Sequence, residues 1–165
     1  MSKQSVEAVR ASYKPKPILT LFVGESAPNS GEFFYYGNSA LTGYMNKAME
    51  AAGLGEDGDF LDRFKAYGWY LDDLVLTPVN HLRGAQRRKE CRDAQNSMAA
   101  RIKGYQPRAI VALLLSIRGI VEDAAKDAGS NARLFAVPFA GNGNQNRFRK
   151  QIAPILPQLP RSTPS

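Results

Sequence analysis

The sequence predicts one α/β domain: a four-stranded parallel sheet with helices on both faces. Four short apolar runs alternate with longer segments of helical periodicity, and one run, Ala109–Leu115, is apolar at every position. A continuous apolar run is typical of a strand that is buried on both faces, as in parallel sheets. Strands that alternate with helices favour crossover connections, which keep the strands parallel.

The first strand is expected over residues 18–23, which are rich in β-branched and aromatic side chains. The other strands are expected over 70–76, 109–115 and 134–137. Helices are expected where apolar residues recur at helical spacing, over 39–52, 58–66, 85–103, 117–128 and 145–156. Glycines that follow three of these helices, Gly53, Gly104 and Gly129, provide C-terminal stops.

The segments outside this alternation are polar. Residues 1–16 are basic and close on a Lys-Pro repeat, which predicts a flexible basic arm. Residues 17–157 form the predicted domain, and the Pro- and Ser-rich residues 158–165 are expected to be a disordered tail.

The charge favours a polyanionic partner. The net charge is +7, and basic residues gather in two segments, one containing Arg87 and Arg88 and the other Arg147 and Arg149. An excess of this size suits nucleic acid, single- or double-stranded, although a solvated basic surface is the alternative.

Composition excludes several classes of protein. A single cysteine, Cys91, permits no internal disulfide and no cysteine-ligated metal or iron–sulfur cluster within one chain. The N-terminus lacks the apolar core of a signal peptide, and no apolar run is long enough to span a bilayer. We therefore expect a cytoplasmic monomer without metal, cofactor or membrane contact.

Ligands of open parallel sheets bind beyond the carboxyl ends of the strands. The loop after the first strand, Gly24–Gly37, is rich in Gly and Pro and contains Glu25 and the aromatic tetrad Phe33–Tyr36. Glu25 is a candidate for accepting a proton or orienting a water, or else a structural acid that binds the turn's own N–H groups. Some of the aromatics are expected in the core, and one or two as a platform on which a base stacks.

Three other features of the strand-end segments are informative. Asp72 and Asp73 lie inside a strand, where alternation sends them to opposite faces, so we expect one to be solvated and the other to have a partner. The only histidine, His81, is interpreted as a bystander. The Gly141–Asn146 loop lacks the third glycine of a dinucleotide fingerprint, so NAD is not expected. The helix that follows begins with basic residues, which suit a bound phosphate or, equally, a solvated surface.

These residues resemble those of the uracil-DNA glycosylase superfamily over nearly the whole domain. Gly24-Glu25-Ser26-Ala27-Pro28 is similar to the G-E-A-P-G first motif of the iron–sulfur glycosylases. Tyr35–Leu41 resembles their F-V-G-x-A-G stretch, and Asp72–Thr77 their T-N-V-V-K-C. The segment from Phe135 to Lys150 occupies the place of their second motif.

The resemblance implies an enzyme that flips a damaged base into a pocket and breaks its glycosidic bond. It implies that Glu25 positions the water, that Tyr35 stacks under the base, and that Ser26, Phe34 and Asp73 contact the base. Phosphate and DNA contacts then fall to seven residues: Asn142, Gly143, Asn144, Gln145, Arg147, Arg87 and Arg88.

The chain departs from the family pattern at several positions. Val137 stands before Pro138 where a leaving-group histidine is usual, Asp73 replaces the base-reading Asn, and the cluster cysteines are absent. A carboxylate accepts hydrogen bonds and so suits the exocyclic amine of cytosine or adenine. Two alternatives to a glycosylase stay open, a non-catalytic nucleic-acid binder on the same fold and a small-molecule site.

Overall fold

The computed structural model describes residues 5–55 and 58–162, and it confirms the predicted α/β fold. Four parallel strands form one sheet in the order β2-β1-β3-β4. Their bounds are β1 Thr20–Gly24, β2 Trp69–Asp73, β3 Ala109–Ala112 and β4 Arg133–Ala136. β1 and β3 are central and β2 and β4 form the edges; the burial of β3 agrees with the continuous apolar run that predicted it.

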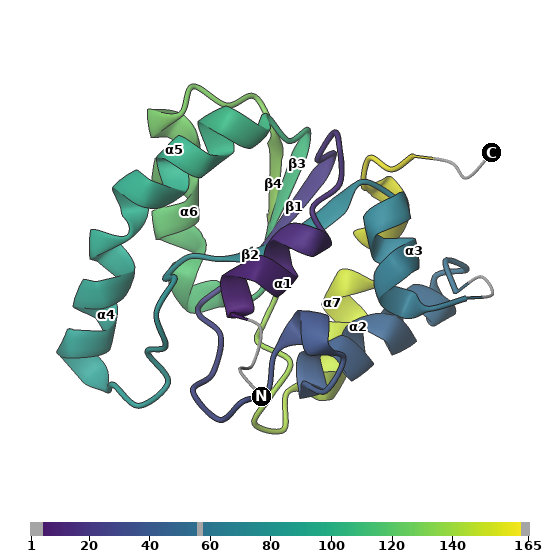
Figure 1. Ribbon diagram of the computed structural model, residues 1–165, viewed down its shortest axis with the longest axis horizontal. Helices are drawn as coiled ribbons and strands as arrows, with labels where there is room; N and C mark the ends of the chain where they lie inside the picture. The colour runs from purple at the N-terminus through teal and green to yellow at the C-terminus, as the bar shows by residue number, and fades with distance from the viewer. Residues whose placement is uncertain (1–4, 56–57, 163–165) are drawn as a thin grey trace.

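Helices cover both faces of the sheet (Figure 1). One face carries α5 (Gln95–Tyr105) and α6 (Arg118–Asp127), and the other carries α2 (Ala40–Ala51), α3 (Phe60–Ala66) and α7 (Gln145–Ile152). Short 3-10 turns lie at Phe34–Tyr36, Leu115–Ile117 and Leu156–Gln158. In the part of the chain that the structure describes, no helix combines the length and apolarity that crossing a bilayer requires.

The predicted long basic helix over 85–103 is two helices. α4 spans Gly84–Asp93, and α5 begins after Ala94 and runs to Tyr105. Gln106, with φ of 50°, provides the left-handed stop that we expected from Gly104. The break separates a highly charged helix near the strand ends from one that packs on α6 and the sheet.

The N-terminal segment differs from the flexible arm expected over 1–16. Residues Val6–Ser12 form α1, which Ser5 caps by accepting a hydrogen bond from the Ala8 N–H at 3.1 Å. Arg10 of this helix is buried, because it reaches acids at the end of β2. Buried ion pairing therefore anchors this helix together with Val6, Val9 and Tyr13, which pack against the core.

The segment from 158 to 162 also differs from the disordered tail expected over 158–165. Leu159 is buried, and the Pro160 carbonyl accepts hydrogen bonds from Thr20 Oγ1 and Trp69 Nε1, both at 2.9 Å. The Ser162 N–H donates to the Tyr67 carbonyl. These bonds hold the segment against the amino ends of β1 and β2; residues 163–165 lie outside the described part of the chain.

Candidate functional site

A cavity of about 340 Å³ lies beyond the carboxyl ends of the strands, where open parallel sheets bind ligands. It receives residues from the end of β1 (Gly24), the end of β2 (Asp73), the segment after β3 and the loop after β4. The register pairs Gly24 with Asp73, so the ends of these two strands lie side by side. The volume falls within the range of about 300–1,000 Å³ that is typical of small-molecule sites.

Most of the cavity wall is apolar or backbone, and a few side chains supply charge. The charged lining residues are Glu25, Glu32, Asp73 and Arg87. Ser26, Ser39, Asn80 and Asn142 add uncharged polar groups, and Phe33, Phe34, Tyr44 and Phe139 add aromatic rings. A mostly apolar wall with a few polar groups suits a ligand with a flat ring and hydrogen-bonding edges.

Arg87 of α4 binds Glu25 through both carboxylate oxygens. Arg87 Nε lies 2.9 Å from Glu25 Oε2, and Arg87 Nη2 donates to Oε1. The Cys91 thiol, one turn further along α4, lies 3.6 Å from Glu25 Oε2. Glu25 therefore faces the cavity as an acceptor that is already oriented, and its hydrogen bond raises the pKa of the Arg87 guanidinium.

The Cys91 thiol is buried and unreactive in character. Burial, followed by the charge of Glu25, raises the pKa of Cys91 to about 11. A nucleophilic cysteine needs a lowered pKa, so the burial and raised pKa of Cys91 indicate a core residue.

Asp73 lies between Arg10 and the cavity. Its side chain is almost fully buried, and Arg10 Nη1 donates to Oδ2 at 2.9 Å. The other oxygen, Oδ1, makes no hydrogen bond with the described residues and lies only 2.7 Å from where a Cβ on Gly24 would be. Burial raises the pKa of Asp73, and the Arg10 guanidinium opposes that change.

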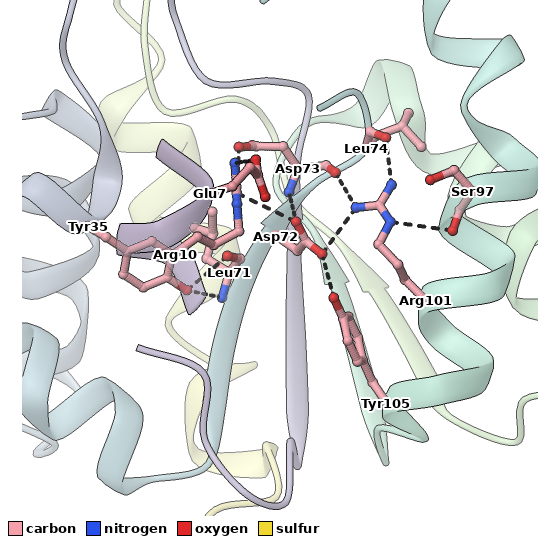
Figure 2. Close-up of polar contacts among 10 residues, drawn as sticks. All are labelled: Glu7, Arg10, Tyr35, Leu71, Asp72, Asp73, Leu74, Ser97, Arg101 and Tyr105. Carbon is pink, nitrogen blue, oxygen red and sulfur yellow. Dashed lines mark hydrogen bonds and ion pairs between the residues drawn. The ribbon is translucent and has the colours of Figure 1, made fainter. Parts of the chain in front are cut away.

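Asp72 is enclosed by a second arginine, and Figure 2 shows the two aspartates between Arg10 and Arg101. Arg101 Nη1 lies 3.1 Å from Asp72 Oδ2, which also accepts a hydrogen bond from the Tyr105 hydroxyl at 3.0 Å. Arg101 further donates to the carbonyls of Asp73 and Leu74. The expectation that one aspartate is solvated is wrong, because charge pairing buries both.

Tyr35 does not line the cavity but belongs to the core. Its hydroxyl donates to the Leu71 carbonyl at 2.8 Å and accepts from the Leu71 N–H at 2.6 Å, and its ring stacks on Tyr13. Phe33 and Phe34 are the members of the tetrad that line the cavity. The structure therefore does not support Tyr35 as the stacking aromatic and places Phe33 at the site instead.

Polar side chains connect the loop after β1 with the loop after β2. Ser26 lines the cavity, and its Oγ accepts a hydrogen bond from the Val79 N–H at 3.1 Å, which ties the loop after β1 to the loop after β2. Asn80 of the second loop also lines the cavity and exchanges hydrogen bonds with Asn29. His81 is exposed and is not among the lining residues.

The Gly/Asn loop after β4 contributes only its first part to the cavity. Asn142 lines it, with φ of 57°, and Gly143 follows at φ 82°. Asn144 precedes α7, and the Gln145 amide donates to the Tyr44 hydroxyl at 3.0 Å. Arg147 and Arg88 are exposed outside the cavity, so of the seven predicted phosphate-binding residues only Asn142 and Arg87 line it.

Sequence reasoning missed Arg10, Phe33 and Phe139 as residues at or behind the site. The helix that holds Arg10 did have a signal in the sequence. Ser5 is a suitable N-cap, and Val6, Val9 and Tyr13 follow it at helical spacing. Phe139 lies in the loop after β4 and is 46% exposed, and Gly141 lies close against its ring.

No group of three or more His, Cys, Asp or Glu side chains that could hold a metal occurs within 5–55 and 58–162. No protein-family model and no curated protein matches the sequence. The interpretation of the site therefore depends on its own geometry.

Proposed function

We propose that this protein is a DNA glycosylase-like hydrolase that holds an extruded base in the strand-end cavity. The observation that carries the proposal is the convergence of Glu25 and Asp73 in one mostly apolar cavity at the carboxyl ends of β1 and β2. Two carboxylates in such a cavity suit a reaction in which one reads the leaving base and the other acts on water. Phe33 and Phe34 supply apolar ring surface for the base.

The proposed reaction breaks the bond between C1′ of the sugar and the base nitrogen. The bonding electrons leave with the base, and positive charge develops on the sugar. Glu25 stabilises that charge and orients a water, whose oxygen bonds to C1′ while its proton passes to Glu25. Arg87 fixes the orientation of the carboxylate by binding both of its oxygens, and it must release one of them before Glu25 can take the proton.

The net charge supports nucleic acid as the substrate. Arg83, which precedes α4, and Arg88 and Lys89 within it are exposed cations near the cavity-lining Arg87, and Arg147 is exposed at the start of α7. Cations at such positions neutralise phosphates, so the affinity of the protein for nucleic acid must fall as the salt concentration rises.

The test is a single-turnover assay on a panel of damaged-base oligonucleotides, duplex and single-stranded, with enzyme in excess. We expect Glu25→Gln to keep DNA affinity and lower the rate of abasic-site formation by about 100-fold or more. Glu122→Gln, on the exposed surface of α6, is the charge-matched control. The glycosylase proposal fails if the wild-type protein forms no abasic product from any member of the panel.

Non-catalytic binding of nucleic acid is the second candidate. Two observations favour it. Arg87 binds both carboxylate oxygens of Glu25. The fully buried Val137 occupies the position where the glycosylase pattern has a leaving-group histidine. Salt-sensitive binding without any abasic product supports this candidate. The absence of both binding and product leaves the small-molecule alternative.

A further inference from the structure

Arg10 contacts two residues of the cavity wall from behind. Its guanidinium binds Asp73 Oδ2 at 2.9 Å, and its Cζ lies 5.1 Å from the centre of the Phe33 ring. Both partners line the cavity, whereas Arg10 itself does not. Arg10 of α1 therefore fixes the Asp73 carboxylate and the Phe33 ring, both of which a ligand in the cavity would contact.

The two aspartates differ in how their charges are compensated. Asp72 has Arg101, the Tyr105 hydroxyl and a longer contact of 3.5 Å with Arg10. For Asp73, Arg10 is the only cation in an ion pair within the described part of the chain. Glu7 and Asp72 add negative charge nearby, so Arg10 alone favours the carboxylate form of Asp73 against burial.

The free oxygen of Asp73 lies toward the cavity end of β1. Oδ2 is occupied by Arg10, while Oδ1 lies against the Cα of Gly24, another lining residue, and has no hydrogen-bond donor among the described residues. An ionised carboxylate oxygen in that position accepts hydrogen bonds and donates none.

We propose that Arg10 is a positioning residue that holds Asp73 as a pure acceptor, so that the cavity selects bases presenting an amino group and rejects bases presenting a carbonyl there. This inference rests on the proposed binding of a nucleobase in the cavity. It deepens that proposal by naming the class of base, amino-bearing bases such as cytosine or adenine, and by making α1 part of the site.

Cytosine and uracil form a pair of probes of similar size that differ at ring position 4, amino group against carbonyl, and at N3, which accepts in cytosine and donates in uracil. The experiment measures binding of two single-stranded oligonucleotides that differ only in one central base, cytosine or uracil, flanked by thymines. We expect wild-type protein to bind the cytosine probe about tenfold more tightly.

Arg10→Met removes the cation and keeps much of the side-chain volume. Without that cation, burial raises the pKa of Asp73 further and favours the protonated, donating form, so the cytosine preference is expected to fall to about one or reverse. Arg10→Lys retains a cation and is expected to retain most of the preference. A purely structural role for Arg10 would weaken both probes equally and leave their ratio unchanged, and that result overturns the inference.

Asp73→Asn keeps the proposal testable if Arg10→Met does not fold. The amide presents a donor as well as an acceptor, so the preference is again expected to disappear. Wild-type protein that binds neither probe contradicts the proposed function itself. Wild-type protein that binds both probes equally contradicts only the role assigned to Arg10 and Asp73.

Discussion

Replacing Tyr35 by Phe tests whether the Tyr35 hydroxyl satisfies the free backbone groups at the edge of the sheet. β2 is an edge strand, and the Leu71 N–H and C=O are not paired with β1 but with the Tyr35 hydroxyl, at 2.6 and 2.8 Å. Burial raises the pKa of Tyr35 well above 10, so the hydroxyl keeps the proton that it donates. One side-chain group therefore satisfies two backbone groups that a neighbouring strand would otherwise satisfy.

The expected loss follows from those two backbone groups. A buried donor or acceptor without a partner costs about 1–3 kcal/mol, so Tyr35→Phe should lower the free energy of unfolding by about 3 kcal/mol. For a chain of this size that loss corresponds to a fall in Tm of roughly 6–12 °C. The proposed binding of nucleic acid should not change well below the Tm, because the hydroxyl contacts Leu71 and Tyr35 does not line the cavity.

The measurement is thermal and urea unfolding of both variants of the stacked pair, Tyr35→Phe and Tyr13→Phe. The two rings lie 5.2 Å apart and nearly parallel, and the Tyr13 hydroxyl makes no hydrogen bond within the described residues. Tyr13→Phe should therefore change stability by less than about 0.5 kcal/mol. An equal effect of the two substitutions would refute the assignment of the Tyr35 hydroxyl to the sheet edge.

Three other predictions concern the site and its surroundings. Gly24→Ala places a Cβ 2.7 Å from Asp73 Oδ1, so it should weaken oligonucleotide binding at least about tenfold in a fluorescence-anisotropy titration, since the carboxylate must move. Cys91, with its pKa raised to about 11, stays a thiol at neutral pH and should resist iodoacetamide until urea unfolds the chain, as mass spectrometry would show. Arg101→Met removes the ion pair with Asp72 and should cost about 3–5 kcal/mol in urea unfolding, whereas Arg118→Met, in an exposed pair, should cost below about 1 kcal/mol.

The sheet was predictable because its signal is local. Apolar runs such as Ala109–Leu115 and their alternation with helical segments depend only on nearby residues, and the observed strands lie within two or three residues of the expected bounds at most ends. The position of the site followed from the same signal, since the loops after parallel strands meet at one edge. Glu25 directly follows β1 and lines the cavity for that reason.

The errors arose where long-range pairing decides the structure. Arg10 and Asp73 are 63 residues apart, and neither helical spacing nor composition shows that a basic N-terminal segment buries its arginine on a strand end. Tyr35 and Phe33 are neighbours in an aromatic tetrad, so the pattern could not decide which ring reaches the cavity. The 3-10 turn at Phe34–Tyr36 makes that choice by turning the Tyr35 hydroxyl toward the edge of β2.

The Pro160 carbonyl has a consequence for the order in which the chain is made. It is the acceptor for the Thr20 hydroxyl and the Trp69 indole, which precede it by 140 and 91 residues. Synthesis proceeds from the N-terminus, so both donors are translated long before their acceptor. A nascent chain, or a product truncated before Pro160, must leave these groups in water or bury them unpaired. The domain is therefore complete only when this last described segment has been translated. Products truncated before Pro160 should be less stable than the full chain.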